Sequence, residues 1–253
     1  MAETTEITMD TDWGAPGAQL TGAQVQAFIK SQFKALIKQT ELLEQRLSGS
    51  ECGCYIAYYS TNGVNNGMKQ LATYDKWPEI AASAKPIGVV VLSETLQPLL
   101  ISLSNLSGHW GEDLQPIHTL IETSSAAVVA MNGKNTTHSL QNSDKLTSDA
   151  NSAISLCLKY SKVETINGKD YGVPAGDWWL PSVGELMIML KYRDAINRCL
   201  SVIAGANVFG YGNFCSSNEY SATEIWALTL FNGNLYIADK RSGFSIRPVS
   251  RWF

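Results

Sequence analysis

The chain has 253 residues, of which 45% are hydrophobic and 17% are charged, and its formal net charge is −4. This apolar content is sufficient for a folded core, whereas a pI of about 5.4 gives no basic field to attract nucleic acid or an anionic membrane. The acidic first residues lack the basic and apolar blocks of a signal peptide, and no apolar run is long enough to span a bilayer. We therefore expect a protein made in the cytoplasm, with no nucleic-acid partner and no membrane insertion.

The cysteines and histidines do not have metal-binding spacing. The five cysteines are odd in number and irregularly spaced, which does not predict a disulfide framework, so we expect free thiols. Cys52 and Cys54 have no second pair or nearby histidine to complete a zinc site, and His109, His118 and His138 are scattered along the chain. We expect no metal and no cofactor.

A long amphipathic helix is predicted near the N-terminus. Thr21 and Gln24 have the spacing of a capping box, and apolar residues then recur at steps of three, four or seven. Part of this pattern is a short heptad seam. Two interpretations are open: the helix packs on its own domain, or it bundles with copies of itself in a symmetric oligomer. We assign residues 1–50 to an N-terminal segment whose helix, residues 23–47, forms a homo-oligomer, with a trimer as the expected state.

Residues 51–150 are predicted to form a small β-containing region. Two apolar segments, residues 87–92 and 99–103, have the composition of strands and are joined by a short polar connection. By contrast, residues 132–152 are polar and rich in Asn, Ser and Thr, which predicts a loop or a solvated connection.

The local signals are strongest in residues 151–253. A short helix is predicted from residue 153, and the capping box of Ser182 and Glu185 then begins an apolar helix that is expected to run to about residue 203. Further on, Asn232-Gly233 separates two apolar segments, which is a strong hairpin signal, and the chain closes on one more strand. The whole chain is therefore predicted to be of the α+β class.

Several short motifs in this last region occur in a recognisable order. They are Trp179-Leu180-Pro181-Ser182 with Glu185-Leu186, Ser216-Ser217 with Glu219-Tyr220, Ala222 with Trp226, Asn232-Gly233, and Arg247-Pro248-Val249. In this order they resemble the C-type lectin fold domains of diversity-generating retroelement variable proteins and of their non-diversified bacterial relatives. The resemblance covers roughly residues 150–253 and implies a C-terminal C-type lectin fold domain. The segment Thr11 to Phe33 is similar to the N-terminal part of tail proteins from prophages of gut bacteria.

The resemblance implies a variable binding face. Where the family usually has a tryptophan before the two serines, this chain has Cys215, which indicates either a diversified position or a divergent core residue. Varied codons in such systems cannot encode Trp, Met, Gln, Glu or Lys, and the corresponding positions here contain none of these types. The candidate ligand-binding residues are Phe214, Cys215, Ile225, Ala227, Thr229, Phe231, Tyr236, Ile237, Ala238, Asp239, Arg241, Gly243, Phe244 and Ser245.

Strand parity gives a second argument for this face. Alternate residues of a strand point to opposite sides of a sheet, so if Trp226 is buried, Ile225 and Phe231 lie on the other side and are exposed. Exposed rings among small polar residues are typical of a binding surface. The alternative is a sheet with both faces buried, in which Phe231, Tyr236 and Phe244 belong to the core.

Three functions follow from these patterns. We favour a receptor-binding protein of a phage tail, located in the virion, which attaches to a protein or glycan receptor on a bacterial cell. The second is a bacterial surface adhesin, for which a signal peptide would be expected. The third is an enzyme similar to formylglycine-generating enzymes, which share the broad fold, with Cys199 and Cys215 as a redox or copper pair. No further catalytic group accompanies this pair in the sequence, so we expect no enzyme. The ligand triplets of calcium-dependent lectins are also missing, and we expect no calcium site.

Overall fold

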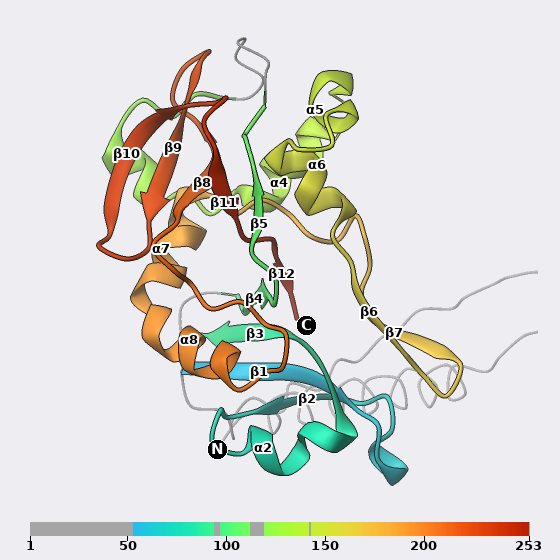
Figure 1. The fold of residues 1–253 in the computed structure, drawn as a ribbon. Coiled ribbons are helices and arrows are strands. Elements are labelled where there is room, and N and C mark those ends of the chain that lie inside the picture. Colours follow the sequence, from blue (N-terminus) through green and yellow to red (C-terminus); the bar gives the residue numbers. More distant parts are fainter. Residues whose placement is uncertain (1–52, 94–96, 112–118, 142, 253) are drawn as a thin grey trace, which may run out of the picture. The chain divides into compact units, whose positions relative to one another are not determined.

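The computed structural model (Figure 1) describes residues 53–93, 97–111, 119–141 and 143–252. The chain divides into two compact units, Met1–Glu51 and Cys52–Phe253. The predicted helix at 23–47, with its oligomer seam, lies outside the described residues, as do Cys52 and His118. Among the residues that are described, none of the helices combines the length and apolar character needed to cross a membrane.

The first sheet has five antiparallel strands and contains two that the sequence predicts. Both faces of its third strand are covered, because Val89, Val90 and Val91 are all buried. The strands predicted at 87–92 and 99–103 are confirmed as neighbours in this sheet. Its members are β1 (Gly53–Ser60), β2 (Lys69–Ala72), β3 (Ala84–Leu92), β4 (Leu99–Ser102) and β12 (Val249–Arg251), in the spatial order β12-β4-β3-β1-β2.

The second sheet carries most of the candidate binding residues. It consists of β5 (Leu106–Gly108), β8 (Asn213–Glu219), β9 (Glu224–Thr229), β10 (Asn234–Asp239) and β11 (Phe244–Ile246), in the spatial order β10-β9-β8-β11-β5. The predicted hairpin is confirmed: β9 and β10 are antiparallel, and Gly233 in their connection has a φ of 75°, which favours glycine. Residues 213–219 of the loop-like segment 213–222 form the central strand β8.

The C-terminus forms two short strands rather than the single one predicted. β11 pairs with β8 and β5 in the second sheet, whereas β12 pairs with β4 in the first. Pro248 lies between them, and since proline donates no backbone hydrogen bond it suits the point where the chain leaves one sheet for the other. Strands from both sides of residue 150 therefore share both sheets. The boundary predicted there does not divide the second unit.

The predicted helix after residue 182 is present but broken. The capping box of Ser182 and Glu185 is formed, and it begins α7 (Val183–Lys191). Tyr192 has φ −103° and ψ 12°, which ends α7, and α8 (Arg193–Ser201) follows in a new direction. The break lets α7 pack on β8 and β9 of the second sheet while α8 packs on β1 and β3 of the first.

Residues 132–152 are helical, so the prediction of a loop is wrong. They contain α4 (Gly133–Leu140) and α5 (Asp144–Ser148), which follow α3 (Ser124–Val128) and precede the confirmed helix α6 (Ala153–Lys159). Thr136, Thr137 and Leu140 of α4 are buried, and the Thr137 hydroxyl accepts a hydrogen bond from the Leu180 backbone N–H at 3.0 Å. Tertiary contacts thus stabilise a helix whose sequence is polar. Figure 1 shows these helices beside β5 of the second sheet.

Smaller elements complete the fold. A hairpin that the sequence patterns did not predict joins β6 (Lys162–Ile166) to β7 (Lys169–Val173) through Asn167-Gly168, both of which have positive φ. The remaining helical segments are η1 (Gly63–Asn65), α2 (Trp77–Ile80) and η2 (Ala81–Ser83).

Candidate binding face and groove

Several candidate binding residues are buried, and the expectation that they are exposed is wrong. Ile225 and Ala227 are fully buried, as are Phe214 and Cys215 at 1% exposure and Phe244 at 5%. Strands β8 and β9 are therefore covered on both faces. The alternative of a sheet with both faces buried holds for Phe244, but not for Phe231, which is 54% exposed, or for Tyr236, which is half-buried.

The physical reason lies in three helices on this side of the sheet, of which the sequence predicted α6 but not α4 and α5. Side chains of α4, α5 and α6, including Leu140, Leu146 and Ile154, pack with Ile225 and Phe244 in one hydrophobic cluster on this side of the sheet. On the opposite side, Leu228 packs in the core cluster shared with the first sheet, and Trp226 packs against Val183 at the start of α7.

The other candidate residues reach the surface. Phe231 is 54% exposed and Ile237 is 38% exposed. Arg241 and Gly243 are exposed as well. The remaining candidates are half-buried, and they are Thr229, Tyr236, Ala238, Asp239 and Ser245.

A shallow groove of about 630 Å³ lies among the exposed candidates. Arg241, Gly243 and Ser245 line it together with part of the Phe244 residue. The rest of the lining comes from β5 and the residue after it, from the segment before α6, and from the start of β8 with the residues before it; it includes Ser107, His109, Asn151, Tyr211 and Asn213. The structure therefore brings one group of predicted residues together with others that the sequence patterns did not single out.

An exposed aromatic pair stands at the edge of this groove. Tyr211 is 79% exposed, and its ring centroid lies 4.4 Å from that of Phe231, with the planes inclined by 47°. The Arg193 guanidinium donates to the Phe231 carbonyl at 2.6 Å, which fixes the backbone beneath that ring. Large apolar side chains that stay in water side by side are characteristic of interaction sites.

The charged groups of the groove are already paired. Arg241 donates from Nε and Nη2 to the two carboxylate oxygens of Asp239, at 3.0 and 2.8 Å. These hydrogen bonds lower the pKa of Asp239 to about 2 and raise that of Arg241. Across the groove, His109 Nε2 lies 2.5 Å from Asp149 Oδ2. Burial raises the pKa of Asp149, but hydrogen bonds from the Asn151 backbone and from His109 outweigh it, so the net shift is downward.

A buried ion pair supports the groove from beneath. Lys240 lies between the candidates Asp239 and Arg241, yet its side chain and that of Glu219 are both fully buried, and the two form a salt bridge. The Lys240 ammonium also lies 4.7 Å from the centroid of the Trp110 ring. Of the three consecutive residues 239–241, Lys240 therefore belongs to the buried scaffold, whereas Asp239 and Arg241 reach the surface.

Arg247 fixes the segment that carries Tyr211. Its buried guanidinium donates to the carbonyls of Ser102 and Asn207 at 2.9 and 2.7 Å, and it lies 4.6 Å from the Phe209 ring centroid. Burial lowers its pKa to about 10, which still leaves it protonated at neutral pH. The motif residues Arg247 and Trp226 are thus confirmed as parts of the core rather than of the surface.

The proposed cysteine pair is not formed. Cys199 belongs to the core cluster between the sheets, where its neighbour is Cys54, whereas Cys215 lies with Cys157 in the cluster beneath α4–α6. Burial raises the pKa of Cys199 to about 11 and that of Cys215 to about 12. A thiol buried in apolar surroundings is a poor nucleophile at neutral pH, because little of it is present as thiolate.

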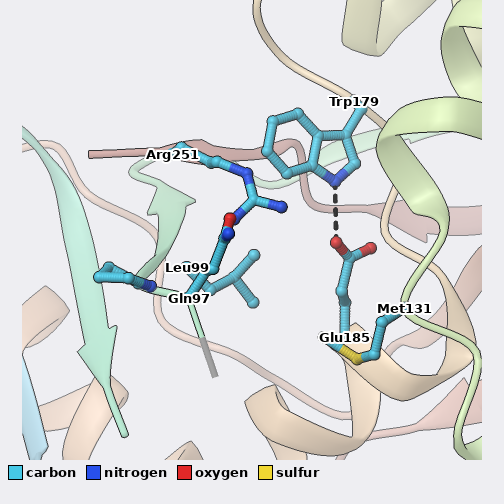
Figure 2. A pocket seen from close by; sticks show the side chains of 7 residues that line it. Gln97, Leu99, Met131, Trp179, Glu185 and Arg251 are labelled. Carbon is cyan, nitrogen blue, oxygen red and sulfur yellow. Dashed lines mark hydrogen bonds between the residues drawn. The ribbon is translucent and has the colours of Figure 1, made fainter. Parts of the chain in front are cut away.

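A second, smaller pocket of about 230 Å³ contains the buried Glu185 (Figure 2). Its carboxylate accepts from the Trp179 indole at 3.1 Å and from the Ser182 backbone and hydroxyl at 2.7 and 2.9 Å. Burial raises its pKa in spite of these hydrogen bonds and of the nearby Arg251. Because the carboxylate already caps α7 and orients Trp179, we interpret this pocket as part of the scaffold.

Tyr211 and Asn213 are the site residues that the sequence reasoning missed. The sequence contains a weak signal for an exposed ring at this position. Tyr211 is an aromatic residue between two glycines, Gly210 and Gly212, and glycines are typical of a segment outside strands and helices. A Cβ at Gly212 would lie 2.3 Å from Ser245 Oγ, so the glycine allows this segment to approach β11 and close the groove.

No family model and no curated protein matches the chain. Among solved structures, a fimbrial protein from Bacteroides ovatus aligns with a TM-score of 0.41 and 13% sequence identity, over 78% of this chain and 43% of that one. The chain thus spans less than half the length of that protein. A TM-score of 0.41 is too low to establish a shared fold, so neither the fold nor the function of this chain follows from the likeness.

Proposed function

We propose that the protein is a receptor-binding protein that attaches to the surface of a bacterial cell through the groove and the aromatic pair Tyr211–Phe231. The observation that carries the proposal is this exposed aromatic pair, which stands next to a lined groove. Hot spots of binding surfaces are enriched in aromatic residues and arginine, and both are present here.

The division of the candidate residues supports the same function. Scaffold residues such as Glu219, Lys240 and Arg247 are buried, while Phe231 and Arg241 beside them are free to change without a cost in packing. A variable binding protein needs a surface that tolerates substitution and a scaffold whose buried residues stay unchanged. In this proposal the domain is of the C-type lectin type, in keeping with the motif order in the sequence.

The setting of the protein is also part of the proposal. A phage tail is favoured by the likeness of residues 11–33 to prophage tail proteins, and a bacterial surface adhesin is the alternative. In either setting we propose a homo-oligomer, with a trimer expected, since several weak contacts tethered together bind far more tightly than one. We propose a binding role without enzymatic activity, nucleic-acid partner or membrane insertion.

Attachment is tested by mixing the labelled full-length chain with a panel of gut bacterial strains and measuring retention on cells. We expect saturable binding to a subset of strains, which excess unlabelled protein displaces. Phe231→Ala should weaken it, whereas Tyr74→Ala, which alters an exposed tyrosine near α8, should not. Absence of saturable binding across the panel would contradict the proposed function.

A further inference from the structure

We propose that the groove binds a neutral saccharide chain, with the Tyr211–Phe231 pair packing against the apolar face of one sugar ring. This inference rests on the proposed attachment function and names the class of ligand for the same site. It follows from three features of the described residues: the geometry of the rings, the polar groups of the groove, and the state of its charges.

The rings provide a preformed apolar platform. Both rings are exposed, their centroids lie 4.4 Å apart with the planes inclined by 47°, and the Arg193 guanidinium holds the Phe231 carbonyl. Tyr211 lies two residues after Phe209, whose backbone N–H and carbonyl both bond to the Asn197 side chain, at 2.8 and 3.3 Å. The face of a pyranose ring that carries axial C–H groups is flat and apolar, and it packs on such a platform with little loss of side-chain freedom.

The groove beside the platform is lined by groups that match hydroxyls. Asn213, Asn151, Ser107 and Ser245 contribute amides and hydroxyls, which both donate and accept hydrogen bonds, as sugar hydroxyls do. Asn213 Oδ1 accepts from the Thr229 hydroxyl at 2.8 Å, so this amide is held in place before a ligand arrives. An apolar protein anchor would leave such groups without partners and would lose affinity accordingly.

The charge state favours a neutral ligand over an acidic one. Arg241 is engaged by both carboxylate oxygens of Asp239, and His109 by Asp149. A phosphate or uronate is recognised best by a bidentate guanidinium, and here an acidic ligand would have to compete with Asp239 for Arg241 Nε and Nη2. The N–H groups of Arg241 that Asp239 does not engage can donate to the hydroxyls of a neutral sugar in the groove, which Arg241 lines.

The test uses surface polysaccharide extracted from strains that retain the full-length chain, separated by anion exchange into neutral and acidic fractions. We expect the neutral fraction to bind the chain in affinity electrophoresis and to displace it from cells. Tyr211→Ala and Asn213→Ala should each weaken this binding tenfold or more, and Tyr74→Ala should leave it unchanged. Binding of the acidic fraction alone, or equal binding by all variants, would overturn the inference.

Treatment of the cells separates this inference from the attachment function. Periodate, which cleaves vicinal diols, should abolish retention, and protease should not. Retention that survives periodate but is lost after protease would identify a protein receptor, which overturns the saccharide while attachment stands. Absence of retention on every strain would instead overturn the attachment function on which this inference rests.

Discussion

Removing the ammonium of Lys240 tests the buried scaffold beneath the groove. The Lys240 and Glu219 side chains are both completely buried and form an ion pair over the Trp110 ring. Lys240→Met keeps the length and the apolar stem but leaves the Glu219 carboxylate buried without that cation. Breaking a buried pair in this way costs about 3 to 5 kcal/mol of unfolding free energy. For a unit of this size, the melting temperature should fall by roughly 6 to 20 °C.

The measurement is urea unfolding of the full chain, followed by circular dichroism, for Lys240→Met, Glu219→Gln and the double variant. Because the double variant contains neither charge, it should be more stable than the sum of the two single changes predicts, by about 2 kcal/mol or more. The matched control is Arg241→Met, one residue away but exposed, which should change stability by less than about 0.5 kcal/mol. A cost below about 1 kcal/mol for Lys240→Met, or strictly additive effects, would refute the reasoning.

Three further predictions concern the core and the walls of the groove. Trp226→Ala should cost about 3 to 5 kcal/mol in thermal or urea unfolding, since the indole is 5% exposed and donates to the Ile121 carbonyl at 2.6 Å; a cost as small as that of Phe231→Ala would show that the faces are misassigned. Arg247→Met should cost about 1 to 3 kcal/mol because the buried Ser102 carbonyl and the partly buried Asn207 carbonyl lose their donor, and cell retention should weaken with it; retention unchanged in a destabilised variant would separate Arg247 from the site. The pKa of Asp149 is lower in the folded state than the unfolded-state pKa of about 3.9, so its ionised carboxylate stabilises the fold above pH 3.9 and stops doing so as the pH falls through the folded-state pKa. Asp149→Asn should therefore lower the free energy of unfolding at pH 7 and make that free energy fall less steeply in acid. An identical acid profile in both proteins would contradict this.

Local features of the fold were predictable from the sequence because they depend on neighbours in the chain. The capping box of Ser182 and Glu185 and the Asn232-Gly233 turn need only a few adjacent residues, and both are present in the structure. The motif residues Trp226 and Arg247 are large or charged groups in apolar surroundings, and both are in the core.

The exposure of the candidate face was not predictable in the same way. The alternation of residues along a strand shows which side chains share a face, but it does not show whether other elements cover that face. Here the cover on one side is α4–α6. The polar sequence of α4 and α5 predicts a loop, and α4 depends on contacts such as that of Thr137 with Leu180. The break at Tyr192, which no glycine or proline marks, and the transfer of the chain between sheets at Pro248 likewise depend on distant partners.

The site was predictable in part. Arg241, Gly243 and Ser245, which the resemblance names as candidates, line the groove, whereas Phe214 and Cys215 point into the two opposite cores. Tyr211 was missed because its role depends on the distant ring of Phe231.

The most direct test of the account measures both stability and attachment to cells in one double variant, Tyr211→Ala/Phe231→Ala. Both rings are exposed, so the melting temperature should stay within a few degrees of that of the unchanged chain. Loss of two aromatic anchors should lower the affinity for cells at least thirtyfold, which corresponds to about 2 kcal/mol. Undiminished retention on cells by this variant, correctly folded, would contradict the claim that the groove and its aromatic pair form the binding site.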